Sequence, residues 1–166
     1  MKAASLGEIR RELDSLGTAE LAQLCARLAR YKQENKELLT YLLFEAHDEG
    51  SYVMNIKSEV DALFRTVPKG NVYFVKKSIR KILRFINKQV RYSGIAVTEL
   101  ELRIYFCEHM RSAGIPLPPG TVLSNLYHQQ LKKIKNVWLK LPEDLQFDYE
   151  NDLRSIHEHG GVKFEV

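Results

Sequence analysis

The chain has 166 residues, of which 45% are hydrophobic and 28% charged, a composition typical of a soluble globular protein and not of a disordered one. This length suits a single domain, which we expect over residues 1–161, and no run approaches the ~18 consecutive apolar residues of a membrane span. The net charge is +4, and the cysteines Cys25 and Cys107 lack metal-type spacing, so we expect free thiols, no cofactor and a cytoplasmic location.

Apolar residues recur at helical spacing along nearly the whole chain, which predicts an all-α fold. Ser5 with Glu8, and Thr98 with Glu101, each fit the capping box that opens a helix. The segment 114–120 holds three prolines and two glycines, so it interrupts the helical pattern. Eight helices are predicted, at about residues 5–16, 18–31, 36–43, 50–66, 71–92, 97–112, 121–141 and 142–159.

The short connections between these helices predict stacked antiparallel αα-hairpins. The stack can form an irregular αα-superhelix or a compact helical bundle. No fixed period and no tetratricopeptide or ankyrin signature is found. Residues 162–166 alternate like a strand without an obvious partner, and we expect this C-terminal tail to be loose.

The first 43 residues carry an arrangement seen in a known group of proteins: a short helix, a capped second helix and the sequence Glu34-Asn35-Lys36-Glu37-Leu38-Leu39. With the later basic helix and the two helices after it, this arrangement resembles a family of small, uncharacterised all-helical bacterial proteins. The resemblance implies a HEAT-like or tetratricopeptide-like helical shape, and it implies no catalytic activity.

The segment from Lys69 to Arg91 holds eight Lys or Arg residues and no acid, which leaves 17 bases and 21 acids in the rest of the chain. At ~100° per residue, the apolar residues of its helix fall within an arc of roughly 100° and the cations fill a neighbouring arc of about 140°. We therefore expect one apolar face for the core and one cationic face turned outward.

Like charges on one helix face repel one another, so the cationic face needs a partner or solvent. One possibility is internal: residues 143–158 hold six acids and one arginine, and this acidic helix can pair with the basic one. The others are an acidic or extended protein partner, nucleic-acid phosphate and an anionic membrane surface. The nucleic-acid alternative gains support from residues 109–142, which add five cations without an acid.

We expect a non-enzymatic helical scaffold that presents a basic groove to an acidic or extended protein partner. The alternative is a nucleic-acid-binding module that uses the same helix, and a second alternative is an enzyme. The oligomeric state is left open. The expected partner-binding residues are Lys77, Arg80, Lys81, Arg84, Lys88, Arg91, Lys132, Lys133 and Lys135.

Catalytic and metal-binding patterns are weak in this sequence. His157-Glu158-His159 places two histidines two residues apart, which cannot share one helix face, so we expect no metal site. Cys107 would need a histidine from elsewhere, such as His128, to become a nucleophile. We therefore expect no catalytic residues.

Overall fold

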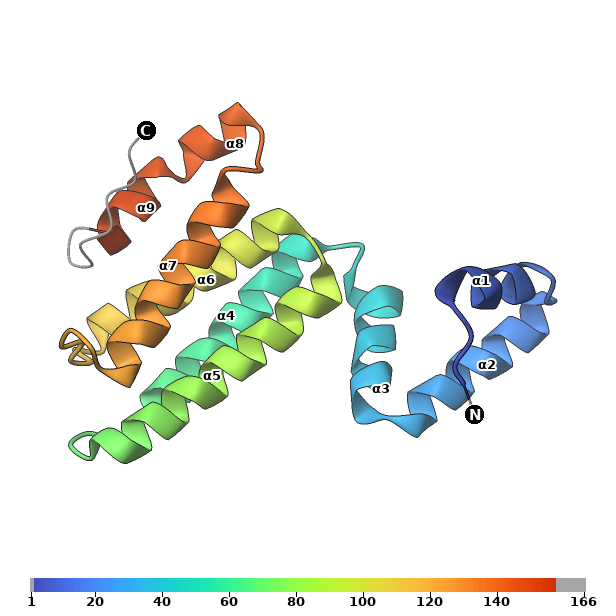
Figure 1. Ribbon diagram of the computed structural model, residues 1–166, viewed down its shortest axis with the longest axis horizontal. Coiled ribbons are helices and arrows are strands. Elements are labelled where there is room, and N and C mark those ends of the chain that lie inside the picture. The colour runs from blue at the N-terminus through green and yellow to red at the C-terminus, as the bar shows by residue number, and fades with distance from the viewer. Residues whose placement is uncertain (1, 158–166) are drawn as a thin grey trace. The chain divides into compact units, whose positions relative to one another are not determined.

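A computed structural model describes residues 2–157 of the chain and shows an all-α fold without a strand in that range (Figure 1). The chain forms two compact units, Met1–Glu45 and Ala46–Val166, which we call the N-terminal and C-terminal units. The tail 162–166 lies outside the described residues. The prediction of a single domain over 1–161 stays a prediction, because a division by contacts does not establish separate folding.

The N-terminal unit consists of three α-helices and one π-helical turn. Its capping box is confirmed, because the Ser5 backbone N–H donates to Glu8 Oε2 at 2.7 Å and the Glu8 N–H donates to Ser5 Oγ at 3.3 Å. The helical backbone is interrupted at Lys32, which is extended and separates one helix from the next. The elements are α1 (Leu6–Asp14), α2 (Thr18–Tyr31), α3 (Gln33–Thr40) and η1 (Tyr41–Glu45).

The described part of the C-terminal unit, residues 46–157, holds six helices. They are α4 (Glu49–Arg65), α5 (Val72–Ser93), α6 (Ala96–Ser112), α7 (Val122–Trp138), α8 (Glu143–Asp148) and α9 (Glu150–His157). Helices α4 and α5 lie side by side as one antiparallel hairpin, and α6 and α7 form a second (Figure 1). The prediction of antiparallel hairpins from short connections is therefore confirmed for this unit.

Helix α6 lies at the centre of the C-terminal unit and contacts α4, α5, α7 and α9. Its apolar residues point in several directions because neighbours cover it on more than one side. This arrangement favours the compact bundle over the superhelix for this unit. The buried residues of α6 are Thr98, Leu100, Leu102, Arg103, Ile104, Phe106, Cys107 and Met110.

Two local predictions differ from the structure. Helix α6 begins after Ile95, and the hydroxyl of Thr98 is buried and donates to a carboxylate oxygen of Glu49 on α4, so the second capping box was wrong. The last predicted helix is divided at Tyr149 into α8 and α9, which brings the number of α-helices in residues 2–157 to nine.

Candidate anion-binding surface

Helix α5 is the longest helix of the described chain, with 22 residues, and both of its ends are fixed by local contacts. At its start, the Asn71 side chain accepts a hydrogen bond from the Tyr73 backbone N–H at 2.9 Å. At its end, Gly94 adopts a positive φ of 67° and donates its N–H to the Val90 carbonyl at 2.9 Å. These caps fix where the basic helix begins and where it ends.

The apolar face of α5 fixes which way the cations point. Helices α4 and α6 contact α5 and cover this face. Since the helix cannot rotate without exposing the buried side chains, its opposite side stays in solvent. The buried residues are Ile79, Ile82, Leu83, Ile86 and Val90.

The cations of α5 form a surface that we call the basic face. Five of its predicted binding residues are exposed, and Lys88 is half-buried. Within residues 2–157, the five exposed side chains have no ion-pair or hydrogen-bond partner. No carboxylate of the described chain therefore compensates their charges. These five residues are Lys77, Arg80, Lys81, Arg84 and Arg91.

A hollow of about 490 Å³ lies along this face, and we call it the basic hollow. On a helical wheel its lining residues share an arc of about 120°. Lys81 and Lys88 lie beyond that arc and do not line the hollow. The residues that line the hollow therefore form the central part of the predicted binding surface. The lining residues are Tyr73, Lys76, Lys77, Arg80, Leu83, Arg84 and Asn87.

Sequence reasoning missed Tyr73, Lys76, Leu83 and Asn87 as lining residues. Asn87 had a detectable signal, because its wheel position lies between those of Lys76 and Arg80 in the cationic arc. Tyr73 carried no such signal, since it is a common aromatic residue in the first turn of the helix.

The buried Arg103 of α6 contacts Asn87, one of the residues that line the basic hollow. The side chain of Arg103 is 5% exposed, and its guanidinium donates to Glu99 Oε1, to Gln130 Oε1 at 2.7 Å and to Asn87 Oδ1 at 3.0 Å. A guanidinium has only donors, so the atom of Asn87 that faces it must be the amide oxygen. The amide N–H groups of Asn87 are therefore the part of this side chain that remains to donate to a ligand.

The same arginine links the basic face to α7. Gln130 lies one turn before Lys133, and burial and the charge of Arg103 lower the pKa of Lys133. Lys132 and Lys133 are exposed and Lys135 is half-buried. The structure thus brings Lys133 toward the Arg103 network.

The acidic helices α8 and α9 lie elsewhere in this unit. Helix α9 contacts α6 and α8, and Arg154 forms its ion pair with Glu150 within the same helix at 3.1 Å. No ion pair found in residues 2–157 joins the five exposed cations of the basic face to these carboxylates. Among residues 2–157, internal pairing therefore does not neutralise the central part of the basic face.

A second polar cluster lies between α4, α6 and the last helices. Lys57 Nζ contacts Glu101 Oε2 at 2.8 Å, and Asp61 Oδ1 accepts from the Tyr105 hydroxyl at 2.6 Å and lies 2.9 Å from His109 Nε2. These groups satisfy one another, and Lys57, Glu101 and Tyr105 line a hollow of only about 100 Å³. The cluster therefore ties helices together and leaves little room for a substrate.

The candidate nucleophile Cys107 is fully buried, and burial raises the pKa of its thiol well above the usual range. A thiol held in this way stays protonated at neutral pH and is a poor nucleophile. His128 places Nδ1 2.8 Å from the Ser124 carbonyl oxygen of its own helix. These two residues do not form a nucleophile and base pair.

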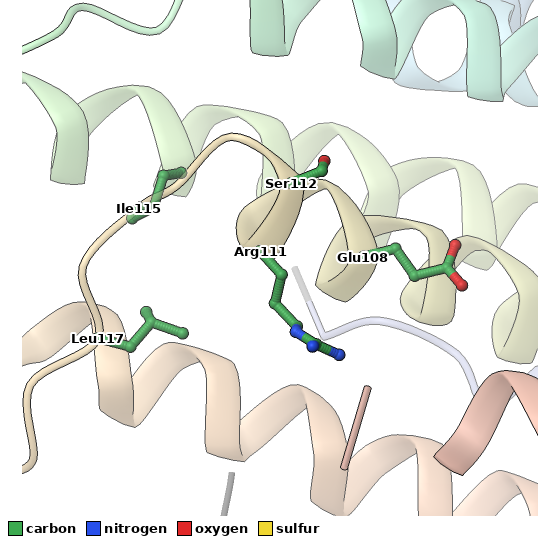
Figure 2. A pocket seen from close by; sticks show the side chains of 5 residues that line it. All are labelled: Glu108, Arg111, Ser112, Ile115 and Leu117. Atoms are coloured by element: carbon green, nitrogen blue, oxygen red, sulfur yellow. The ribbon is translucent and has the colours of Figure 1, made fainter. Parts of the chain in front are cut away.

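A hollow of about 550 Å³ lies where α6 ends and the proline-rich connection begins (Figure 2). Its lining residues Ile115 and Leu117 come from that connection, and Glu108, Arg111 and Ser112 come from the last turns of α6. Burial raises the pKa of Glu108, and the nearby carboxylate of Asp152 raises it further. This hollow has mixed apolar and charged walls and carries no cluster of catalytic groups.

Residues 2–157 contain neither a metal-binding cluster nor a helix able to span a membrane. This range holds no group of three or more His, Cys, Asp or Glu side chains arranged to bind a metal ion. The sequence predicted that His157 and His159 do not form a metal site. Their side chains lie outside the described part of the chain, so this stays a prediction. No helix in the range combines the length and apolar character that crossing a membrane requires.

Comparisons with known proteins found no matching family model, no matching curated protein and no matching solved structure. The resemblance to the small all-helical bacterial family therefore stays a prediction.

Proposed function

We propose that this protein is a non-enzymatic, cytoplasmic helical module that binds an acidic or extended protein partner through the basic face of α5. The observation that carries the proposal is the unpaired state of its exposed cations, fixed outward by the buried apolar face of the same helix. An anionic partner would remove the mutual repulsion of these side chains.

The composition of the basic hollow favours a peptide over a simple polyanion. Its walls combine four cations with the Tyr73 ring, the edge of Leu83 and the Asn87 amide. An acidic peptide can place carboxylates on Arg80 and Arg84 and apolar atoms against Tyr73. The Asn87 N–H groups add directional donors for a carboxylate or a backbone carbonyl.

The test uses the full chain and a fluorescently labelled polyglutamate peptide as the probe, with binding followed by fluorescence anisotropy. Replacing Arg80 and Arg84 by glutamine should weaken binding at least tenfold, because both line the basic hollow. The control variant replaces Lys36 and Lys140 by glutamine. Both lysines are exposed and lie outside α5, so the net charge of the two variants falls by the same amount. Equal weakening by both variants, or binding unchanged by the first, would refute the proposal.

Nucleic-acid binding is the second candidate, because Lys133 of α7 approaches the Arg103 network that backs the basic hollow. The proposed residues for this alternative are those of the basic face with Lys132, Lys133 and Lys135. A labelled RNA oligonucleotide should then bind more tightly than the peptide and lose about a thousandfold in affinity between roughly 50 and 200 mM salt. That outcome would replace the protein-partner proposal.

A further inference from the structure

The N-terminal unit does not bury a core of its own. Among residues 2–45 only the side chain of Tyr41 is buried, with 4% of its surface exposed. Helices α1 and α2 have 9 and 14 residues, and helices of this length are marginal in water without tertiary packing. The apolar side chains of these helices therefore need a covering surface.

The uncovered side chains lie on one narrow face of each helix. On α2, Leu24, Leu28 and Tyr31 share an arc of about 60° and are 37%, 56% and 76% exposed. On α1, Leu6, Ile9 and Leu13 follow one another at three and then four residues and are also exposed. Spacings of three and four residues are those of a helix–helix seam.

The charges of this unit favour a second copy of the same unit as the covering surface. Residues 1–45 contain seven acids and seven bases, so two copies do not repel one another. Within α2 the charges are separated: Glu20 lies in the first turn, while Arg27, Arg30 and the C-cap Lys32 lie in the second half. Two antiparallel α2 helices would place the acidic end of each beside the basic half of the other.

We propose that two copies of this chain associate through the exposed faces of their α2 helices, packed antiparallel about a two-fold axis near the helix midpoint. Leu24 and Leu28 form the centre of the seam and Tyr31 its ends. The association is independent of the basic face of α5. The modest size of the seam predicts a dissociation constant in the micromolar range.

The first test measures the mass of the full chain by sedimentation over a wide range of protein concentrations. We expect a shift from monomer to dimer that the substitution Leu28→Asp abolishes, because it places a carboxylate at the centre of the seam. The control is Leu139→Asp in the C-terminal unit, since Leu139 has the same 56% exposure and should leave the dimer intact. A monomer at every concentration, or a dimer insensitive to Leu28→Asp, would overturn the proposal.

Cys25 supplies a second readout, because it is exposed at the midpoint of α2 whereas the other cysteine is buried. A short thiol-specific cross-linker should join two chains at Cys25, and this product should be lost in Leu28→Asp. A Cys25→Ser chain that carries Tyr31→Cys tests the direction, because position 31 lies on the seam face: antiparallel helices hold the two new thiols about 15–20 Å apart and prevent the cross-link. An efficient cross-link at position 31 would indicate parallel helices and contradict the proposed seam.

Discussion

Helices α2 and α5 are both amphipathic, but the apolar face is exposed on α2 and buried on α5. The apolar face of α5 is buried by α4 and α6, and its cations are exposed. On α2 no residue is buried, and leucine and tyrosine side chains face solvent. Amphipathic spacing therefore predicts which residues share a helix face, while the surface that covers this face is supplied by other helices.

The largest expected difference between the two units concerns their cores. Phe106→Ala should lower the free energy of unfolding of the C-terminal unit by about 3–5 kcal/mol, because Phe106 is fully buried in α6. Leu28→Ala should change that value by less than about 0.5 kcal/mol. The single tryptophan, Trp138, is buried in α7 and reports urea unfolding of this unit by its fluorescence. Similar losses in both variants would contradict the comparison.

A second difference separates two arginines that each pair with a glutamate four residues earlier. Arg103 is 5% exposed and Arg154 is 70% exposed. Arg103→Met should cost about 3 kcal/mol, because it leaves Glu99 and the carbonyl groups of Asn87 and Gln130 without their donor. Arg154→Met should cost less than about 0.5 kcal/mol. Urea titrations of the two variants measure this difference, and equal losses would show that Arg103 is solvated.

A third prediction concerns pH. Burial first, and Asp152 second, raise the pKa of Glu108 above the ordinary value of 4.5, so the folded state binds more protons than the unfolded state in the interval between these pKa values. The free energy of unfolding therefore falls as pH rises through that interval. Because Glu108 is partly exposed, the effect should stay below about 1 kcal/mol.

Glu108→Gln removes this titration. The variant should unfold at higher urea concentration than the parent protein at pH 7, and the difference should shrink below pH 4.5. His109, Lys57 and Arg111 also influence Glu108, and they remain in the variant. A variant that is less stable than the parent at pH 7 would show that the Glu108 carboxylate makes a net favourable interaction.

The smallest expected effect lies on the basic face itself. Lys77 and Lys81 are like charges one turn apart, so Lys77→Gln with Lys81→Gln should raise the free energy of unfolding by about 0.3 kcal/mol at low salt. The gain should vanish at high salt, which screens the repulsion. Thermal unfolding at two salt concentrations measures it, and a loss of stability would indicate that these lysines have partners.

Local signals in the sequence were sufficient to predict where most of the helices begin and end. The capping box of Ser5 and Glu8, the helix-ending Gly94 and the interruption at 114–120 all depend on neighbouring residues, and the structure contains each of them. Thr98 and Glu101 satisfied the same local pattern and failed. Their side chains are held by Glu49 and by Lys57 and Tyr149, contacts that no local rule contains.

The candidate site was predictable in part for the same reason. Wheel positions identified the cations of α5 because its apolar face is continuous and regular. The network that orients Asn87 was not predictable, since Arg103 on α6 meets Asn87 on α5 only when the two hairpins are packed against each other. Whether the five exposed cations pair with the acids of α8 and α9 also depends on how the helices pack, which residue spacing does not reveal. In residues 2–157 no ion pair joins them.

The most direct test of the basic face is amine-reactive labelling of the full chain, followed by mass spectrometry at Lys77 and Lys140. Both lysines are exposed, and only Lys77 lines the basic hollow. We predict equal labelling rates in the free protein, and slower labelling of Lys77 alone once the polyglutamate peptide is added. Slow labelling of Lys77 without the peptide, or equal protection of both lysines, would contradict the account.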